Sequence, residues 1–345
     1  MKSGKHLVPP LVVKGTSKST LALILASFAF AGLALGAGIG STGFESLFNA
    51  VNDPIALQII MDIRLPRTLG AWLAGLLLGL SGALAQGLFR NPLADPYLLG
   101  SASGASLGVA ATLLLFGAGA DVSSFVFKLG LSGAAFLGAI LAVSLTLMLS
   151  RGVQHTMRLL LAGIIVSVVL GALTSLSTLL EPQIIQTMQS FLLGTTSFMN
   201  WSSVLLMGTV WSICLAFTWT LSRALDALSL GEATAISLGL NLAPVRAGLI
   251  GALALAIGAA VAQSGLIAFV GLAAPHLVRS LVKVTHDWLI LLSSLMGGLL
   301  LLTADLLARW LSAPEELPVG LFTAVLGGIY LLKLMYTRNM NRESI

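Results

Sequence analysis

The chain has 345 residues, of which 57% are hydrophobic and only 9% are charged. Soluble globular domains are about one quarter charged, so the composition excludes that class and indicates a protein embedded in a membrane. The net charge of +5 follows from the membrane topology described below, and a nucleic-acid-binding surface is a poor alternative.

Apolar stretches long enough to cross a bilayer recur along the chain. A transmembrane helix needs about 20 consecutive apolar residues. We therefore predict an all-α polytopic membrane protein of about ten transmembrane helices, at residues 20–42, 66–88, 96–117, 124–149, 158–180, 200–222, 247–270, 272–285, 288–311 and 318–336. A basic tail at residues 1–19 and a second tail at residues 338–345 flank the membrane domain, which covers residues 20–337.

The first apolar stretch follows a basic N-terminus, as it would in a signal peptide. The segment "LALGAG" at residues 33–38 also offers small residues for cleavage. A retained first helix is the simpler interpretation, because the apolar run is long and many spans follow it.

Lysine and arginine residues indicate the orientation, because they accumulate in cytoplasmic loops. With ten spans and a cytoplasmic N-terminus, 14 of the 18 lysines and arginines lie on the cytoplasmic side. The other four lie outside, and they are Arg64, Arg67, Lys128 and Arg309. This asymmetry predicts a multi-pass membrane protein with both termini in the cytoplasm.

Glycine recurs at a spacing of four residues within the predicted spans. Gly75 and Gly79 form one such pair, and Gly104 and Gly108 form another. In lipid this spacing lets helix backbones approach closely. It predicts tight helix packing rather than a catalytic site.

A short sequence echo suggests internal symmetry. "SGALAQGL" at residues 81–88 and "GAAVAQSGL" at residues 258–266 both place Ala-Gln before Gly-Leu, in the second and seventh spans. These spans cross the membrane in opposite directions, so a true repeat would give inverted-repeat-like halves, as in many transporters. The match is short enough to arise by chance as well as by ancestry.

A polar segment, "LSLGEATAISLGL" at residues 228–240, interrupts the apolar pattern on the predicted cytoplasmic side. Ser229 and Glu232 fit a capping box and Gly239 fits a C-terminal stop, so we predict a short helix over residues 231–238. Asn241 could cap the helix that follows. Such a helix suits docking into a groove of a soluble partner. The alternative is a solvated loop that merely joins two spans.

Motifs of catalysis and ion coupling are absent from the sequence. It has no phosphate-binding loop and no metalloprotease or serine-hydrolase motif, so an enzyme is not predicted. The lone cysteine, Cys214, cannot form an internal disulfide, and no zinc-binding spacing occurs. Mid-membrane carboxylates of the kind that ion-coupled carriers need are few, and Asp305 could instead pair with Arg309 one helical turn away. These features predict a passive pathway whose driving energy comes from another component. A secondary transporter and a noncatalytic scaffold are the alternatives.

From about residue 20 to residue 337 the chain resembles the FecCD family, the permease subunits of type II ABC importers for iron-siderophore complexes, haem and cobalamin. The blocks that carry this resemblance are "RLPRTLGAWLAGLLLGLSGALAQGLFRNPLADPYLLGSASGASLG" at 64–108, "RLLLAG" at 158–163, "LSLGEATAISLGL" at 228–240, "GLIAFVGLAAPHLVR" at 265–279, "HDWLILLSSLMGGLLLLTADLLAR" at 286–309 and "ELPVGLFTAVLGG" at 316–328.

The resemblance implies a type II ABC importer permease fold and a set of partners. The permease forms a homodimer or pairs with a homologous permease, with the translocation path between the two. It works with two cytoplasmic ABC ATPase subunits and with a periplasmic or lipid-anchored substrate-binding protein. No cofactor or metal is expected on this chain, and ATP with Mg²⁺ binds to the partner ATPase.

The resemblance also assigns roles to residues. Coupling helices that contact the ATPase map to residues 228–244, and the motif positions there are Ser229, Gly231, Glu232, Ala235 and Gly239. Arginines that meet carboxylates of the binding protein map to Arg64, Arg67 and Arg309. For the first two the alternative is anchoring at the membrane interface, and for Arg309 it is the pair with Asp305.

The cytoplasmic gate of the family maps to Thr156 and Met157, where a methionine replaces one of two hydroxyl residues. His276 could ligate haem or a metal, but it belongs to a Pro-His pair of the family motif, so a structural role is favoured. The cargo stays open between siderophore, haem and cobalamin, with an iron complex favoured.

Overall fold

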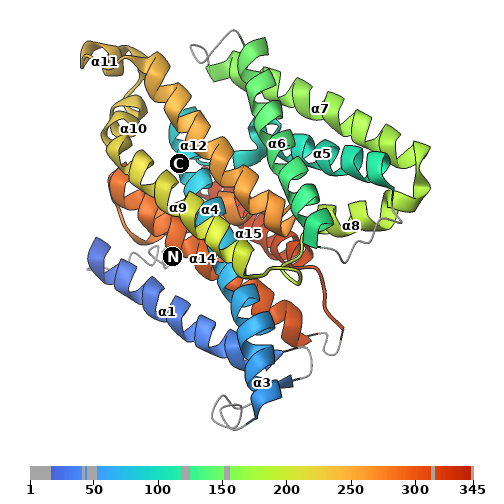
Figure 1. Ribbon diagram of the computed structural model, residues 1–345. Helices are drawn as coiled ribbons and strands as arrows, with labels where there is room; N and C mark the ends of the chain where they lie inside the picture. The colour runs from blue at the N-terminus through green and yellow to red at the C-terminus, as the bar shows by residue number, and fades with distance from the viewer. Residues whose placement is uncertain are drawn as a thin grey trace, which may run out of the picture.

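The computed structural model describes residues 17–40, 43–44, 53–117, 125–150, 156–311 and 315–342, and nearly all of them are helical (Figure 1). The α-helices are α1 (Lys18–Gly38), α3 (Pro54–Ile59), α4 (Leu65–Phe89), α5 (Ser101–Phe116), α6 (Phe125–Leu149), α7 (Thr156–Leu180), α8 (Ile185–Leu193), α9 (Trp201–Thr220), α10 (Ser222–Ser229), α11 (Glu232–Ser237), α12 (Leu242–Ser264), α13 (Val270–Leu281), α14 (His286–Leu311) and α15 (Val319–Arg342). The shorter elements are a π-helical turn, η1 (Ile60–Arg64), two 3₁₀ turns, η2 (Pro96–Leu99) and η3 (Pro182–Ile184), and one antiparallel strand pair, β1 (Ile39–Gly40) with β2 (Gly43–Phe44).

Ten of the helices coincide with the ten predicted spans, namely α1, α4, α5, α6, α7, α9, α12, α13, α14 and α15. Within the described residues, seven helical segments are long and apolar enough to cross a membrane by themselves. Helix α5 and the apolar part of α15 are shorter, and α13 has the 12 residues expected of the short eighth span. The prediction of a helical, multi-pass membrane protein is therefore confirmed.

The two predicted tails overlap with helices. Helix α1 begins at Lys18, inside the predicted N-terminal tail, and α15 continues to Arg342, inside the predicted C-terminal tail. Residues 1–16 and 343–345 lie outside the described part of the chain. The predicted limits of the membrane domain, residues 20 and 337, therefore fall within helices.

Helix α4 is the centre of the bundle (Figure 1). All but three of its 25 residues are buried, as expected for a helix that is apolar or small on every side. It packs against α14, α12, α13 and α9. Arg64 and Arg90, at the two ends of α4, are therefore attached to a helix that its neighbours enclose on every side.

Glycines at four-residue spacing produce the closest helix contacts. A Cβ atom added to Gly75 would lie 2.3 Å from the carbonyl oxygen of Gly297, and one added to Gly79 would lie 2.1 Å from that of Ser293. Between α5 and α6, a Cβ atom at Gly104 would lie 2.2 Å from the carbonyl oxygen of Gly138. The predicted packing role of the glycine pairs is confirmed, because no larger residue fits there without moving a backbone.

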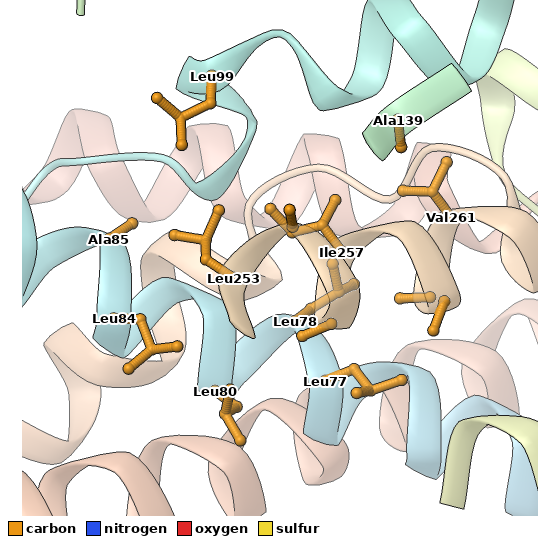
Figure 2. Close-up of a cluster of buried hydrophobic side chains, with 14 of the residues drawn as sticks. Leu77, Leu78, Leu80, Leu84, Ala85, Leu99, Ala139, Leu253, Ile257 and Val261 are labelled. Carbon is orange, nitrogen blue, oxygen red and sulfur yellow. The ribbon is translucent and has the colours of Figure 1, made fainter. Parts of the chain in front are cut away.

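The packing pattern of α4 recurs around α12. Helix α4 packs against α13 and α14, whereas α12 packs against α5 and α6, which occupy the equivalent places in the first half of the chain. The two helices meet in the core, where Leu78 of α4 lies near Ile257 of α12 (Figure 2). This arrangement fits the inverted-repeat-like halves that the sequence echo predicts.

The bundle has two ends that bear polar groups. Helix α4 runs from Arg64 to Arg90 and α14 runs in the opposite direction, from His286 to Arg309. We call the end that carries α10, α11, Arg90 and His286 the Glu232 end, and the end that carries α3, Arg64 and Arg309 the Arg309 end. Figure 1 shows α11 and α3 at these opposite ends.

Candidate functional site

Helix α11 is the short helix predicted from the polar segment, and it projects at the Glu232 end (Figure 1). It ends as predicted at Gly239, whose φ of 83° lies in the left-handed region that favours glycine. The amide of Gly239 donates to the carbonyl of Ile236 at 2.9 Å, and the amide of Leu240 donates to that of Ala235 at 3.1 Å. This pair of bonds is a Schellman motif, which satisfies the last carbonyls of the helix.

The predicted capping box at the start of α11 is wrong. Ser229 is the last residue of α10, and its hydroxyl donates to the carbonyl of Asp226 at 2.6 Å. The N-cap of α11 is Gly231, with a φ of 117°, and no side chain caps the helix. The sequence reasoning failed because it did not anticipate α10, which occupies Ser229. Asn241 likewise holds the N-cap position of α12 without a side-chain hydrogen bond.

Glu232 makes two ion pairs instead of a capping bond. One of its carboxylate oxygens lies 2.5 Å from Nη2 of Arg246 and 3.6 Å from Nη2 of Arg90. The Arg246 side chain is only 4% exposed, so this pair lies partly inside the protein. Arg90 follows the last residue of α4, and Arg246 lies in the second turn of α12. Glu232 therefore holds α11 to both central helices.

Large apolar side chains point away from the bundle around α11. Leu230, Ile236 and Leu238 are 68%, 60% and 63% exposed, whereas Ala235 is fully buried against the bundle. We call these three exposed residues the α11 apolar tip. Grouped apolar side chains beside polar residues are typical of a protein-binding surface. The sequence analysis missed the tip, although its leucines and isoleucine stand out in a polar segment.

A second contact ties α10 to α14. Nδ1 of His286, the first residue of α14, lies 2.6 Å from the carboxylate of Asp226, which accepts a hydrogen bond from the amide of His286 at 3.0 Å. Helices α10 and α11 are therefore joined to α14, α4 and α12 by polar contacts.

The Arg309 end holds a buried charge cluster, which we call the Arg67 cluster: Arg67, Asp305, Arg309 and Glu316, with the hydroxyls of Thr68, Thr196 and Ser197. Nη1 of Arg67 donates to both carboxylate oxygens of Glu316, at 2.7 and 2.8 Å, and its Nη2 lies 3.5 Å from Asp305. Nη2 of Arg309 pairs with the other oxygen of Asp305, and its Nη1 donates to Thr68 at 3.2 Å. Both carboxylates are thus shared among several donors.

Hydroxyl groups complete the cluster. Thr196 donates to Asp305 at 2.5 Å, and Ser197 donates to Glu316 at 2.9 Å. Burial alone would raise the pKa of Glu316, but the hydrogen bonds and charge of Arg67 outweigh it and hold the pKa of that carboxyl below its usual range. Glu316 is therefore ionised at neutral pH. Neither Glu316 nor the two hydroxyls were identified from the sequence, because they lie far from Arg67 along the chain.

The three arginines predicted to face a partner are buried within the chain. Arg64, Arg67 and Arg309 are 5%, 8% and 1% exposed. Arg64 closes the π-helical turn before α4, and its Nη1 donates to the carbonyl of Gly38 at 3.2 Å. Burial contradicts the alternative of anchoring at the membrane interface, which needs exposed side chains. The internal pair of Arg309 with Asp305 is present, and docking itself stays a prediction.

The predicted gate lies at the start of α7. Met157 is 70% exposed there, while Thr156 is the first residue of the helix and its side chain is outside the described part of the structure. The neighbouring turns of α7 also expose large apolar residues, including Leu161 and Ile165. A gate at these positions stays a prediction.

His276 lies in α13 and contacts Tyr330 of α15, with the two ring centroids 5.8 Å apart and the rings edge to face. No group of three or more His, Cys, Asp or Glu side chains gathers as a metal site among the described residues. The contact joins two helices, which is the structural role that the sequence analysis favoured for His276.

Comparison with known proteins places these features in a family context. The model of the FecCD transport family matches residues 20–337. The hemin transport system permease HmuU of Yersinia pestis is 38% identical over 90% of this chain and 94% of its own length. The ferric enterobactin transport system permease FepD of Escherichia coli (strain K12) is 39% identical over 80% of this chain and 81% of its own.

A solved structure shares the fold. A metal-chelate type ABC transporter in an inward-facing conformation superposes with a TM-score of 0.82 and 30% sequence identity, over 92% of this chain and 99% of the other. The ten-helix arrangement described above is therefore that of an ABC transporter permease.

Proposed function

The chain belongs to the FecCD transport family, the permease subunits of ABC importers, and from that premise we propose that it forms the translocation path of an ATP-driven importer for an iron complex. The observation that carries the proposal is the family match over residues 20–337, supported by relatives named for the transport of hemin and ferric enterobactin. A siderophore complex or haem is the proposed cargo, and cobalamin is the alternative.

The proposed assembly is a permease dimer with two ABC ATPase subunits. The translocation path lies between this chain and a second copy or a homologous permease. Exposed apolar residues along α7 and α15 supply surface for that contact or for lipid; examples are Ile165, Leu176, Val325 and Ile329. The ATPases bind ATP with Mg²⁺, and this chain binds no cofactor. In this proposal the Glu232 end and both termini face the cytoplasm across a bacterial inner membrane.

The proposed coupling element is α11, which contains Ala235, with its flanking residues Ser229, Gly231 and Gly239. Ser229 acts only by ending α10, because its hydroxyl is bonded there. The α11 apolar tip enters a groove of the ATPase, and Glu232 passes the resulting displacement to α4 and α12 through Arg90 and Arg246. Met157 and Thr156 are proposed to narrow the path at this same side.

The proposed docking site for a substrate-binding protein is the Arg309 end. Arg64, Arg67 and Arg309 place three guanidinium groups near the start of α4 and the end of α14. Arginine takes carboxylates in a bidentate geometry, which suits a partner with acidic docking residues. Burial of these groups means that docking requires a local rearrangement.

Reconstitution tests the proposal. The chain is purified with a cognate ABC ATPase, placed in liposomes, and supplied with the cognate binding protein and ⁵⁵Fe-labelled siderophore or haem. Uptake that requires all components and ATP supports the importer. Uptake by the chain alone, driven by a proton or sodium gradient, would instead establish a secondary transporter. ATPase binding without any uptake would point to a scaffold.

A further inference from the structure

Glu316 is the exchangeable member of the Arg67 cluster. Asp305 has no exposed surface and accepts from Arg67, Arg309 and Thr196, so an incoming group cannot replace it. The Glu316 side chain is 25% exposed and lies in the loop between α14 and α15. It is therefore the only carboxylate of this cluster that both reaches a buried arginine and touches solvent.

In the free chain the four terminal guanidinium nitrogens of Arg67 and Arg309 all have partners, whereas the buried Nε atoms of the two arginines have none. Two guanidinium groups, those of Arg67 and Arg309, face two carboxylates, those of Asp305 and Glu316. The Arg67 side chain is only 10% exposed, and Nη1 is engaged by both oxygens of Glu316. A carboxylate from outside can bind Nη1 of Arg67 only by taking the place of Glu316.

Replacement of Glu316 would loosen the start of α15. Val319, the first residue of α15, follows Glu316 by three positions. The same segment is seated on the end of α8, where the amide of Gly320 donates to the carbonyl of Gly194 at 3.3 Å. The ion pair with Arg67 thus joins the N-terminus of α15 to the central helix α4, and α15 carries an exposed apolar face that includes Val325 and Ile329.

We propose that Glu316 occupies, within the free chain, the site on Arg67 that a carboxylate of the substrate-binding protein takes on docking, and that this exchange releases the loop that fixes α15. The inference rests on the proposed function, since it needs an acidic partner at the Arg309 end. Docking of the binding protein at the surface would in this way allow the membrane helix α15 to move. The carboxylate of the binding protein then competes with Glu316 for Arg67. This competition keeps the affinity of the transporter for the binding protein low.

The test uses the complete transporter in nanodiscs, with its ATPase, and the binding protein from the same gene cluster as the probe. Glu316→Gln removes the competing charge, and Glu315→Gln is the matched control at an exposed neighbouring position. With Glu316→Gln we expect binding at least about fivefold tighter, because a competing charged hydrogen bond is removed. We also expect faster hydrogen exchange at the amides of residues 315–323 without any binding protein. The control should change neither quantity.

Unchanged affinity together with unchanged exchange in Glu316→Gln would overturn the inference, as would weaker binding. If the unmodified transporter fails to bind the probe at all, the proposed function fails, while the exchange measurement still reports on the Glu316 pair by itself.

Discussion

Glu232 lies 2.5 Å from Arg246 across the loop that joins α11 to α12. The two residues are 14 positions apart, and Arg246 is almost completely buried. Because the second partner of Glu232 is Arg90 at the end of α4, a single carboxylate links the projecting helix to both central helices.

Replacing Glu232 should uncouple transport from ATP hydrolysis. In Glu232→Arg, three cations meet where an ion pair stood, so α11 loses its fixed position against α4 and α12. We expect uptake per ATP hydrolysed to fall at least about fivefold, the lower end of usual coupling free energies. The measurement is uptake and ATPase activity in the same proteoliposomes at equal expression. Normal coupling in this variant would mean that the loop is passive.

Charging the α11 apolar tip should weaken assembly with the ATPase. Ile236→Asp places a carboxylate where a large exposed apolar side chain is proposed to enter the ATPase. We expect binding about tenfold weaker, the usual effect of removing one interface anchor. Co-purification and titration of the ATPase check this result. Ser280→Asp adds the same charge to an exposed position on α13, outside the proposed coupling segment, and should leave binding intact.

Neutralising Asp305 should destabilise the fold. In Asp305→Asn two buried arginines lose the carboxylate that joins them, and removal of one partner of a buried ion pair costs about 3 kcal/mol. Unfolding in detergent, followed by temperature or by denaturant, measures the loss. Glu315→Gln, at an exposed position, supplies the comparison. A stability equal to that of the parent chain would show that the Arg67 cluster is energetically unimportant.

Enlarging Gly79 should disturb the contact between α4 and α14. Gly79→Ala puts a methyl group 2.1 Å from the carbonyl oxygen of Ser293, which forces the backbones apart at a cost of about 1 to 3 kcal/mol. Gly251→Ala is the control, since a Cβ there meets no atom within 4 Å. It should be neutral or slightly stabilising, because alanine favours the helix. Equal melting temperatures for the two variants would contradict the close-packing interpretation.

Features that depend on local sequence were predictable. The ten spans follow from hydropathy, the contacts of Gly75 and Gly79 follow from their spacing, and the end of α11 at Gly239 follows from the need for a positive φ. Each depends on residues within a few turns of one another. Such features can be predicted because the bilayer and the backbone geometry determine them from local sequence alone.

Features that depend on distant residues were not predictable. Arg67 and Glu316 are 249 positions apart, so no local pattern joins them. The burial of Arg309 depends on how α14 packs against α4, which charge counting cannot reveal. Ser229 was misassigned for a related reason, because its hydroxyl is used by α10, an element hidden in the transition from an apolar span to a polar loop.

The backbone contact between α4 and α14 has a thermodynamic consequence. These helices run the full distance between Arg90 and His286 at one end and Arg67 and Arg309 at the other, with no room to slide past each other at Gly75 and Gly79. If binding at one end alters affinity at the opposite end through these helices, linkage requires the same factor in both directions. A nucleotide that strengthens attachment of the outer protein would itself be held more tightly once that protein is attached.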